Sequence, residues 1–315
     1  MQALPQVVEH ARTEVGKGVV GQQRFIDEVL LAVLCGGHAL IEGVPGIAKT
    51  LAVKLLARML QVDFQRVQCT SDLMPADVIG SNVFNSATAT FALHKGPLFT
   101  DLLLADEINR MPPRTQAALL EAMEERQVTI DGVRHPLTEF FTVLATQNPI
   151  EFEGTYPLPE AQLDRFLLKI KVTYPSFNDE IAMLEKHHNG FDARELESLQ
   201  IRPIPKDALR LARCEVRGVK VEPALFRYLG EIVRRTRDWP SLSLGASPRA
   251  AVSLLLVAKA KAGIDGRDYL IPDDVKEAAL PVLRHRVMLK PEAELEGIDT
   301  DAVIRDVLAA VEVPR

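Results

Sequence analysis

Apolar residues recur along the first half of the chain with two spacings, which predict strands that alternate with helices. Short, mostly apolar runs typical of buried strands occupy residues 38–42, 64–70, 100–106, 140–147 and 166–173. Helical periodicity separates them, most clearly in residues 22–35, 49–60 and 112–127. Strands that alternate with helices in this way predict a parallel sheet covered by helices on both faces.

Two segments interrupt this alternation and are predicted to be inserted β-hairpins. Residues 128–137 carry Asp131-Gly132 between apolar-rich arms, a strong signal for a two-residue turn. Residues 82–99 give a weaker signal, with β-rich arms around a centre of Ser, Ala and Thr.

After Pro175 the pattern changes to helices alone, most of which open with a proline or a polar residue. A chain of 315 residues has room for two domains. We therefore predict an α/β core over residues 1–174, followed by a smaller all-α domain over residues 175–315.

Composition and charge narrow the class of protein. Lys and Arg number 37 and Asp and Glu 43, and the net charge of −6 argues against a general nucleic-acid binder held by phosphate contacts. Neither a long apolar run nor a secretory signal pattern is present. Cys35, Cys69 and Cys214 have mostly apolar neighbours, which predicts buried, reduced thiols. Together these features indicate a soluble, cytoplasmic protein without a membrane span.

The histidines show neither metal-ligand spacing nor a catalytic arrangement with Ser, Asp or Cys. We expect His38, at the start of a predicted strand, to be a packed or capping residue.

The stretch IEGVPGIAKT, residues 41–50, is similar to a phosphate-binding loop between a strand and a helix. Such loops read Gly, four residues, Gly, Lys and then Ser or Thr, whereas Ala48 stands here in place of the second glycine. Gly43 and Gly46 supply an open turn whose N–H groups can cradle phosphate at the helix start. We expect the Ala48 methyl group to be tolerated, because a residue at the helix start has negative φ.

Lys49 and Thr50 complete this loop. The Lys49 amine can reach the β- and γ-phosphates, and the Thr50 hydroxyl can ligate Mg²⁺. The alternative is a strand-to-helix turn that carries an ordinary surface lysine.

Polar residues also end two of the predicted strands. Asp106 could hold Mg²⁺ directly or through water, and Glu107 could activate a water as general base. The amide of Asn148 could hold that water or the γ-phosphate. The alternatives are a helix-capping acidic pair and an Asn-Pro turn.

Two arginines are further candidates for a functional role. Arg165 follows a short predicted helix, and Arg249 lies in the first turn of a later one, where a cation opposes the helix dipole. A surface salt bridge is the alternative for each, because acids such as Asp164 are available.

Together the segments GVPGIAKT, LLLADEINR, ATQNP and LPEAQLDRF resemble the MoxR family of AAA+ ATPases, in the clade that includes magnesium-chelatase ATPase subunits and MCM helicases. The resemblance runs from Val20 to Lys171 and continues more loosely beyond. It implies a P-loop NTPase core, with a parallel sheet sandwiched by helices, followed by a helical lid.

The resemblance also implies a role for each candidate. Lys49 and Thr50 would be the Walker A pair, with Thr50 and Asp106 as the metal ligands. Glu107 would be the Walker B glutamate and Asn148 sensor 1. The implied nucleotide contacts are Val20, Gly21, Gly43, Val44, Pro45, Gly46, Ile47, Ala48, Lys49, Thr50 and Leu51.

Arg165 would be an arginine finger that acts on ATP bound to a neighbouring subunit, and Arg249 would be sensor 2. The resemblance therefore implies ATP and Mg²⁺, and a homo-oligomeric ring, usually a hexamer. Residues 83–93 and the hairpin around Asp131-Gly132 would face the pore or a client protein.

Members of this family act as chaperone-like remodellers that mature client enzymes, often by metal or cofactor insertion. A partner with a von Willebrand factor A domain is usual.

Two other hypotheses stay open at this point. A nucleic-acid motor of the same clade would need a basic, aromatic hairpin, which residues 126–137 do not supply. A nucleotide switch without hydrolysis would leave catalytic positions empty, whereas all are filled here.

Overall fold

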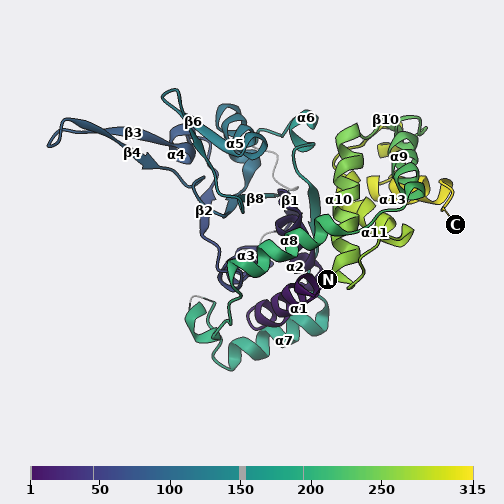
Figure 1. Ribbon diagram of the computed structural model, residues 1–315, viewed down its shortest axis with the longest axis horizontal. Helices are drawn as coiled ribbons and strands as arrows, with labels where there is room; N and C mark the ends of the chain where they lie inside the picture. The colour runs from purple at the N-terminus through teal and green to yellow at the C-terminus, as the bar shows by residue number, and fades with distance from the viewer. Residues whose placement is uncertain (1, 45, 149–153, 194, 315) are drawn as a thin grey trace.

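The computed structural model describes every residue except 1, 45, 149–153, 194 and 315 (Figure 1). Its centre is a five-stranded sheet of order β2-β5-β8-β1-β9, in which all neighbouring strands are parallel. Each strand overlaps a segment predicted from the sequence, so the predicted parallel sheet is confirmed. The strands are β1 (Ala39–Gly43), β2 (Phe64–Gln68), β5 (Leu102–Asp106), β8 (Thr142–Gln147) and β9 (Leu168–Val172).

Helices cover both faces of the sheet, and the alternation of side chains along β5 shows why. Leu102 and Leu104 pack in one apolar cluster with α1, α2 and α3, while Leu103 and Ala105 pack in a second cluster with α5. A strand buried on both faces must be largely apolar, as β5 is from Leu102 to Ala105, before it ends in Asp106. The covering helices are α1 (Ala3–Gly16), α2 (Gln23–Cys35), α3 (Lys49–Met59), α4 (Pro75–Ile79) and α5 (Pro113–Glu125).

Both predicted hairpins are present. The first, β3 (Gly80–Asn85) with β4 (Thr90–Lys95), projects away from the body of the molecule (Figure 1). In the second, β6 (Gln127–Ile130) with β7 (Val133–Pro136), both turn residues have positive φ, as a tight hairpin turn requires. The Asn82 side chain donates to Asp131 at 2.8 Å, which links the two hairpins.

The remaining chain is mainly helical. Helix α8 packs on α1 and α2 of the core, whereas α9, α11 and α13 gather around α10. The predicted boundary at residue 175 stays a prediction. The remaining elements are α6 (Glu160–Leu163), α7 (Phe177–His188), α8 (Lys206–Gly218), α9 (Pro223–Arg237), α10 (Pro248–Ile264), α11 (Pro272–Leu283), α12 (Pro291–Leu295), α13 (Thr300–Ala310) and the 3₁₀ turns η1 (Ile108–Arg110) and η2 (Leu196–Leu199).

The expectation of helices alone after Pro175 is wrong at one place. Strand β10 (Leu242–Leu244) pairs antiparallel with β11 (Met288–Leu289). Each is too short to display the alternation that identifies a strand in a sequence, and they pair only because the helices bring them together.

Arg286 ties the helical part to the core. Its guanidinium is buried and donates to Asp164 Oδ1 at 2.7 Å and to the carbonyl oxygens of Phe166 and Leu167 at 2.7 and 3.1 Å. Asp164 thus pairs with Arg286 rather than with its neighbour Arg165. A buried guanidinium with these acceptors is costly to release.

The cysteine prediction is only partly correct. All three thiols are free, and Cys69 is buried, but Cys35 is half-buried and Cys214 is exposed. Helix α8 buries Leu209, Ala212 and Val216, and Cys214 lies on its opposite face.

Within the described residues, no helix is long and apolar enough to cross a membrane.

His38 is packed, as expected, and it crosslinks two elements. Its Nδ1 accepts from the Val143 N–H at 2.9 Å, so Nε2 carries the proton and donates to the Met123 carbonyl at 3.1 Å. Burial, with the nearby Arg126 charge, lowers the pKa of His38 to about 3. The imidazole is therefore neutral in the folded protein at physiological pH.

This depressed pKa predicts a loss of stability in mild acid. The unfolded chain takes up a proton near pH 6.5 while folded His38 does not, so the stabilisation is complete above that pH and is lost as the pH falls toward 3. Between pH 6.5 and pH 5 the free energy of unfolding should fall by about 1.5 kcal/mol from this group. Urea unfolding at several pH values measures it. His38→Gln should flatten the slope, and His94→Gln, a change of an exposed histidine, serves as the control.

Candidate active site

The phosphate-binding loop connects the end of β1 to the start of α3. Gly46 has φ of 82° and Ala48 has φ of 59°, so both adopt the left-handed conformation. The expectation of negative φ at Ala48 is therefore wrong. Ala48 is the cap residue before α3 rather than its first helical residue, and the chain changes direction there. Holding an L-residue in this left-handed conformation costs about 1 kcal/mol of folding free energy. Pro45, a predicted nucleotide contact, lies outside the described residues.

A cavity of about 470 Å³ lies in front of this loop. It is lined by Gly43, Gly46, Ala48, Lys49, Thr50 and Leu51 from the loop and α3, and by Arg66, Gln68, Asp106, Glu107, Thr146, Asn148 and Ala193. The structure thus brings together the predicted lysine, threonine, acidic pair and asparagine. Lys49 Nζ donates to the Gly43 carbonyl at 2.8 Å, and burial lowers the pKa of Lys49 against the opposing effect of both carboxylates.

Asp106 has partners on both carboxylate oxygens. The Thr146 hydroxyl donates to Oδ1 at 2.9 Å, and Arg66 Nε donates to Oδ2 at 2.7 Å. The same Thr146 oxygen accepts from the Glu107 N–H at 2.9 Å. Thr146 on β8 therefore fixes the position of both acidic residues at the end of β5.

Glu107 has a strained backbone, with φ of 61°. Its Oε2 accepts from Gln68 Nε2 at 3.1 Å and forms an ion pair with Arg110 Nε at 3.0 Å. Non-glycine residues in the left-handed region concentrate at functional sites, where the surrounding contacts hold them. The turn directs the Glu107 side chain into the cavity rather than along the strand.

Arg66, Gln68 and Thr146 are site residues that the sequence analysis missed. In β2, Val67 is buried, while Arg66 and Gln68 share the opposite face and the register sets Gln68 beside Asp106. The available signal was the alternate placement of Arg66 and Gln68 near the carboxyl end of the strand.

A second cavity, of about 700 Å³, shares Gly46, Ala48 and Leu51 with the first. Its wall is mostly apolar, which suits a purine base. Val20 and Ile47 line it as predicted, whereas Gly21 and Val44 line neither cavity. Helix α7 and the segments beside it supply most of the remaining wall, which the sequence analysis did not identify: Tyr174, Pro175, Met183, Leu184, His187 and Phe191.

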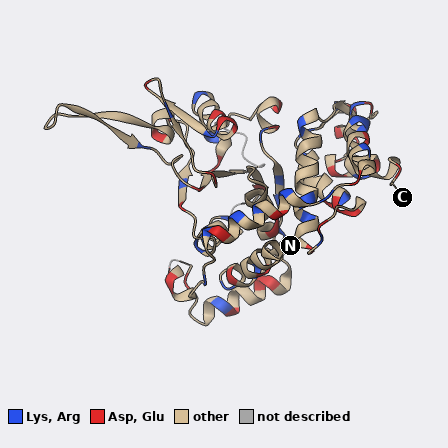
Figure 2. Ribbon diagram, viewed as in Figure 1, with Lys and Arg blue, Asp and Glu red and all other residues tan. Residues whose placement is uncertain are grey.

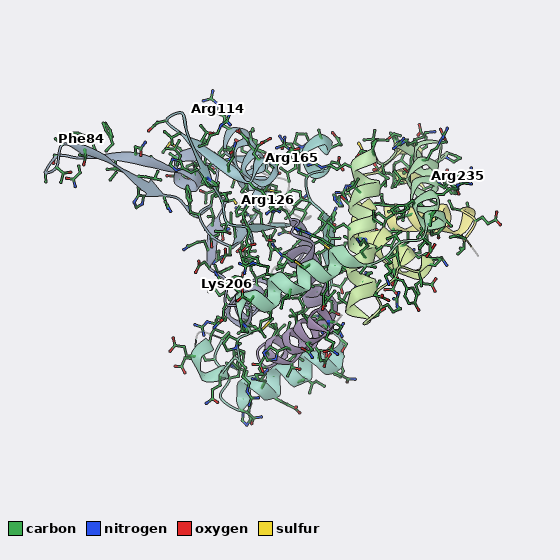
Figure 3. The ribbon with its side chains drawn as sticks, in the orientation of Figure 1. Phe84, Arg114, Arg126, Arg165, Lys206 and Arg235 are labelled. Carbon is green, nitrogen blue, oxygen red and sulfur yellow. The ribbon has the colours of Figure 1, made fainter. Side chains whose placement is uncertain are left out.

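Arg165 and Arg249 lie elsewhere and meet on one carboxylate. Arg165 Nε is 3.0 Å from Glu124 Oε2, and Arg249 Nη2 is 3.1 Å from Glu124 Oε1. Each arginine therefore forms the salt bridge that the sequence analysis gave as its alternative, although the partner is Glu124 rather than Asp164. Figure 3 shows Arg165 between the core and the helices of the lid.

These arginines line a small cavity at the amino-terminal edge of the sheet. The same cavity is lined by Gly37 and His38, which precede β1, and by Leu167, which precedes β9. The phosphate-loop cavity lies at the other end of β1. Because β1 has five residues, the two edges are separated by about 16 Å of strand. Neither arginine lines the phosphate-loop cavity of its own chain.

Known proteins of similar sequence identify the family. Residues 38–168 match the ATPase family associated with various cellular activities (AAA), and residues 234–307 match the AAA lid domain. The chain is 42% identical to Chaperone MoxR1 of Mycobacterium tuberculosis, over 98% of this chain and 82% of that protein. This chain belongs to the MoxR family of AAA+ ATPases.

Two further similarities cover almost the whole chain. The uncharacterized protein YeaC of Bacillus subtilis is 45% identical over 99% of this chain and 95% of that protein. A crystal structure of a protein from Cytophaga hutchinsonii superposes with a TM-score of 0.91 and 42% identity, covering 99% of this chain and 96% of that one. The AAA+ fold predicted from the sequence is confirmed, and this MoxR family member is an ATP hydrolase.

The site also fits a magnesium ion that is shared with phosphate. Among the described residues, no group of three His, Cys, Asp or Glu side chains could hold a metal ion on its own. Mg²⁺ bound with nucleotide needs only one or two protein oxygens, the rest coming from phosphates and water. The Thr50 hydroxyl and the Asp106 carboxylate, both in the phosphate-loop cavity, supply such oxygens.

The left-handed Ala48 predicts an unusual response to glycine. In a helix interior, Ala→Gly costs about 1 kcal/mol. At Ala48 the change removes the φ strain, so Ala48→Gly should leave the free energy of unfolding unchanged or raise it by up to about 1 kcal/mol. Gly46→Ala, which introduces the same strain two residues earlier in the loop, should lower the free energy of unfolding by about 1 kcal/mol. Urea denaturation of both variants measures the contrast, and a clear loss in Ala48→Gly would contradict it.

Proposed function

We propose that this MoxR family ATPase is a ring-forming, Mg²⁺-dependent enzyme that couples ATP hydrolysis to the remodelling of a client protein. A chaperone-like ATPase is what its relatives support. Ring formation, the metal and the client are our own inferences. The observation that carries ring formation is the placement of the candidate residues on two opposite edges of one sheet.

This placement supports a site completed by a second subunit. Arg165 and Arg249 cannot serve the phosphate loop of their own chain, because they line a different cavity about one strand length away. A neighbouring chain that presented its amino-terminal edge would bring both cations to the phosphates. Repetition of one such head-to-tail contact closes into a ring, and we propose a hexamer.

Within one subunit, the roles follow from the contacts. Lys49 and the loop N–H groups would bind the phosphates, with Val20, Ile47 and Leu51 around the base. Glu107 would take the proton of the attacking water, and Asn148 would orient that water by hydrogen bond. Thr50 and Asp106 would hold Mg²⁺, which neutralises phosphate charge when bound.

The first hairpin supports a protein client over a nucleic acid. Val83, Phe84 and Phe91 are 53%, 55% and 71% exposed, and the two phenylalanine rings pack together with centroids 5.2 Å apart. Figure 2 shows almost no charge along β3 and β4, apart from Lys95 at the base. An uncharged apolar tip suits contact with protein, whereas a nucleic-acid motor would need cations there.

We propose further that the client is an enzyme matured by metal or cofactor insertion, with help from a partner that carries a von Willebrand factor A domain. We also propose a cytoplasmic location. The free thiols of Cys35, Cys69 and Cys214 support a reducing compartment.

The proposed general base gives a direct test. Glu107→Gln should bind ATP as the native protein does, because the side chain keeps its size, but turnover should fall by about 10²- to 10⁴-fold. Calorimetric ATP binding and phosphate release measure the two effects. Glu125→Gln, a change of an exposed residue on α5, should keep native turnover. Native turnover in Glu107→Gln would exclude this role.

Mixed assemblies test the action of Arg165 on a neighbour. Arg165→Ala should lower turnover by about 10³-fold or more, and Lys49→Ala should abolish ATP binding. Mixing the two variants creates interfaces that combine a native phosphate loop with a native Arg165. Phosphate release should therefore rise above that of either variant alone. Mixtures no more active than their components would show that the finger does not act between chains.

A further inference from the structure

The phosphate-loop cavity contains an arginine that belongs neither to the loop nor to the arginine pair on Glu124. Arg66 projects from β2, the edge strand, and its Nε donates to Asp106 Oδ2 at 2.7 Å. Its Nη2 donates to Gln68 Oε1 at 2.9 Å, which steadies the guanidinium. The one carboxylate in the site that is suited to Mg²⁺ is thus already neutralised by a side chain.

The charges around the two acidic residues explain why a cation is needed there. Asp106 and Glu107 are adjacent, and Lys49 is hydrogen-bonded to the Gly43 carbonyl rather than to either carboxylate. Arg110 pairs with Glu107 at 3.0 Å, and Arg66 pairs with Asp106. Each carboxylate therefore has its own arginine. Without Arg66, Asp106 would keep the hydrogen bond from the Thr146 hydroxyl and the more distant charge of Lys49.

Mg²⁺ and Arg66 compete for the same carboxylate. Each carboxylate oxygen can accept two hydrogen bonds, so the bonds from Thr146 and Arg66 leave room for a metal ion or its water. The Arg66 guanidinium nevertheless lies 2.7 Å from Oδ2 and repels a second cation there. Mg²⁺ requires a strict octahedral arrangement of oxygen ligands and keeps its bound waters, which need acceptors of their own. The Arg66 side chain is 45% exposed on an edge strand, so it can swing into solvent when displaced.

We propose that Arg66 is a resident counter-cation of the magnesium carboxylate, with which Mg²⁺ competes for Asp106 when it binds with nucleotide. This proposal rests on the proposed use of Mg²⁺. Arg66 acts through Asp106, so it is a positioning residue that sets how much Mg²⁺ the site requires.

Nucleotide binding as a function of Mg²⁺ tests this competition without any turnover. The affinity for the non-hydrolysable analogue AMPPNP is measured by calorimetry, from EDTA to saturating Mg²⁺, for the native chain and for Arg66→Gln. An ion pair with one half-exposed partner is worth a factor of about five or less in an equilibrium. Arg66→Gln should therefore lower the half-saturating Mg²⁺ concentration by up to about fivefold, with unchanged affinity in EDTA.

Two further variants keep the result interpretable. Arg66→Lys retains the charge without the planar pair of donors, so its Mg²⁺ requirement should lie between those of the native chain and Arg66→Gln. Arg58→Gln removes the same charge from the far end of α3, about 13 Å along the helix from Lys49, and should match the native chain.

The possible failures are distinguishable. An equal Mg²⁺ requirement in the native chain and Arg66→Gln would overturn the proposal. Weaker AMPPNP binding by Arg66→Gln in EDTA would also overturn it, because Arg66 would then be a phosphate ligand. Binding by the native chain that does not respond to Mg²⁺ would instead reject the proposed metal dependence itself, before any variant is considered.

Discussion

All strands of a parallel sheet end at the same edge, and this constraint divides the chemistry of the molecule in two. Carboxyl ends of β1, β5 and β8 gather the phosphate loop, the acidic pair and Asn148 around one cavity. The amino ends of β1 and β9 lie beside the cavity that holds Arg165 and Arg249. In the assembly proposed above, a single chain would therefore carry two complementary parts of a site that two neighbouring subunits complete.

The parts that follow from local chemistry could be predicted from the sequence. Strand periodicity gave the sheet, the Asp131-Gly132 turn gave a hairpin, and the position of Asp106 after an apolar strand placed it beside Lys49. Ala48 could not be predicted in the same way, because one backbone dihedral at a helix cap depends on how the loop approaches the helix. A sequence pattern marks the helix start only to within a residue or two.

Contacts between distant segments account for the other errors and omissions. The pairing of Arg66 with Asp106 spans 40 residues, and Arg249 meets Glu124 across 125 residues. Residues so far apart in the sequence show no local pattern that would predict their contact. The exposure of Cys214 depended on which face of α8 met the core, which the residues adjacent to it in the sequence did not reveal.

Helix α10 is held at both ends. Near its start, Arg249 contacts Glu124 of the core, and near its other end Gly263 lies so close to Leu4 of α1 that a Cβ would come within 2.5 Å of that side chain. The helix therefore behaves as a strut, and it cannot tilt against the core without lengthening one contact or creating a clash at the other. Because the other lid helices pack around it, a subunit and its own lid should move as one block. In the assembly proposed above, the movement that hydrolysis drives would then occur at the joints between blocks, where each subunit meets the next.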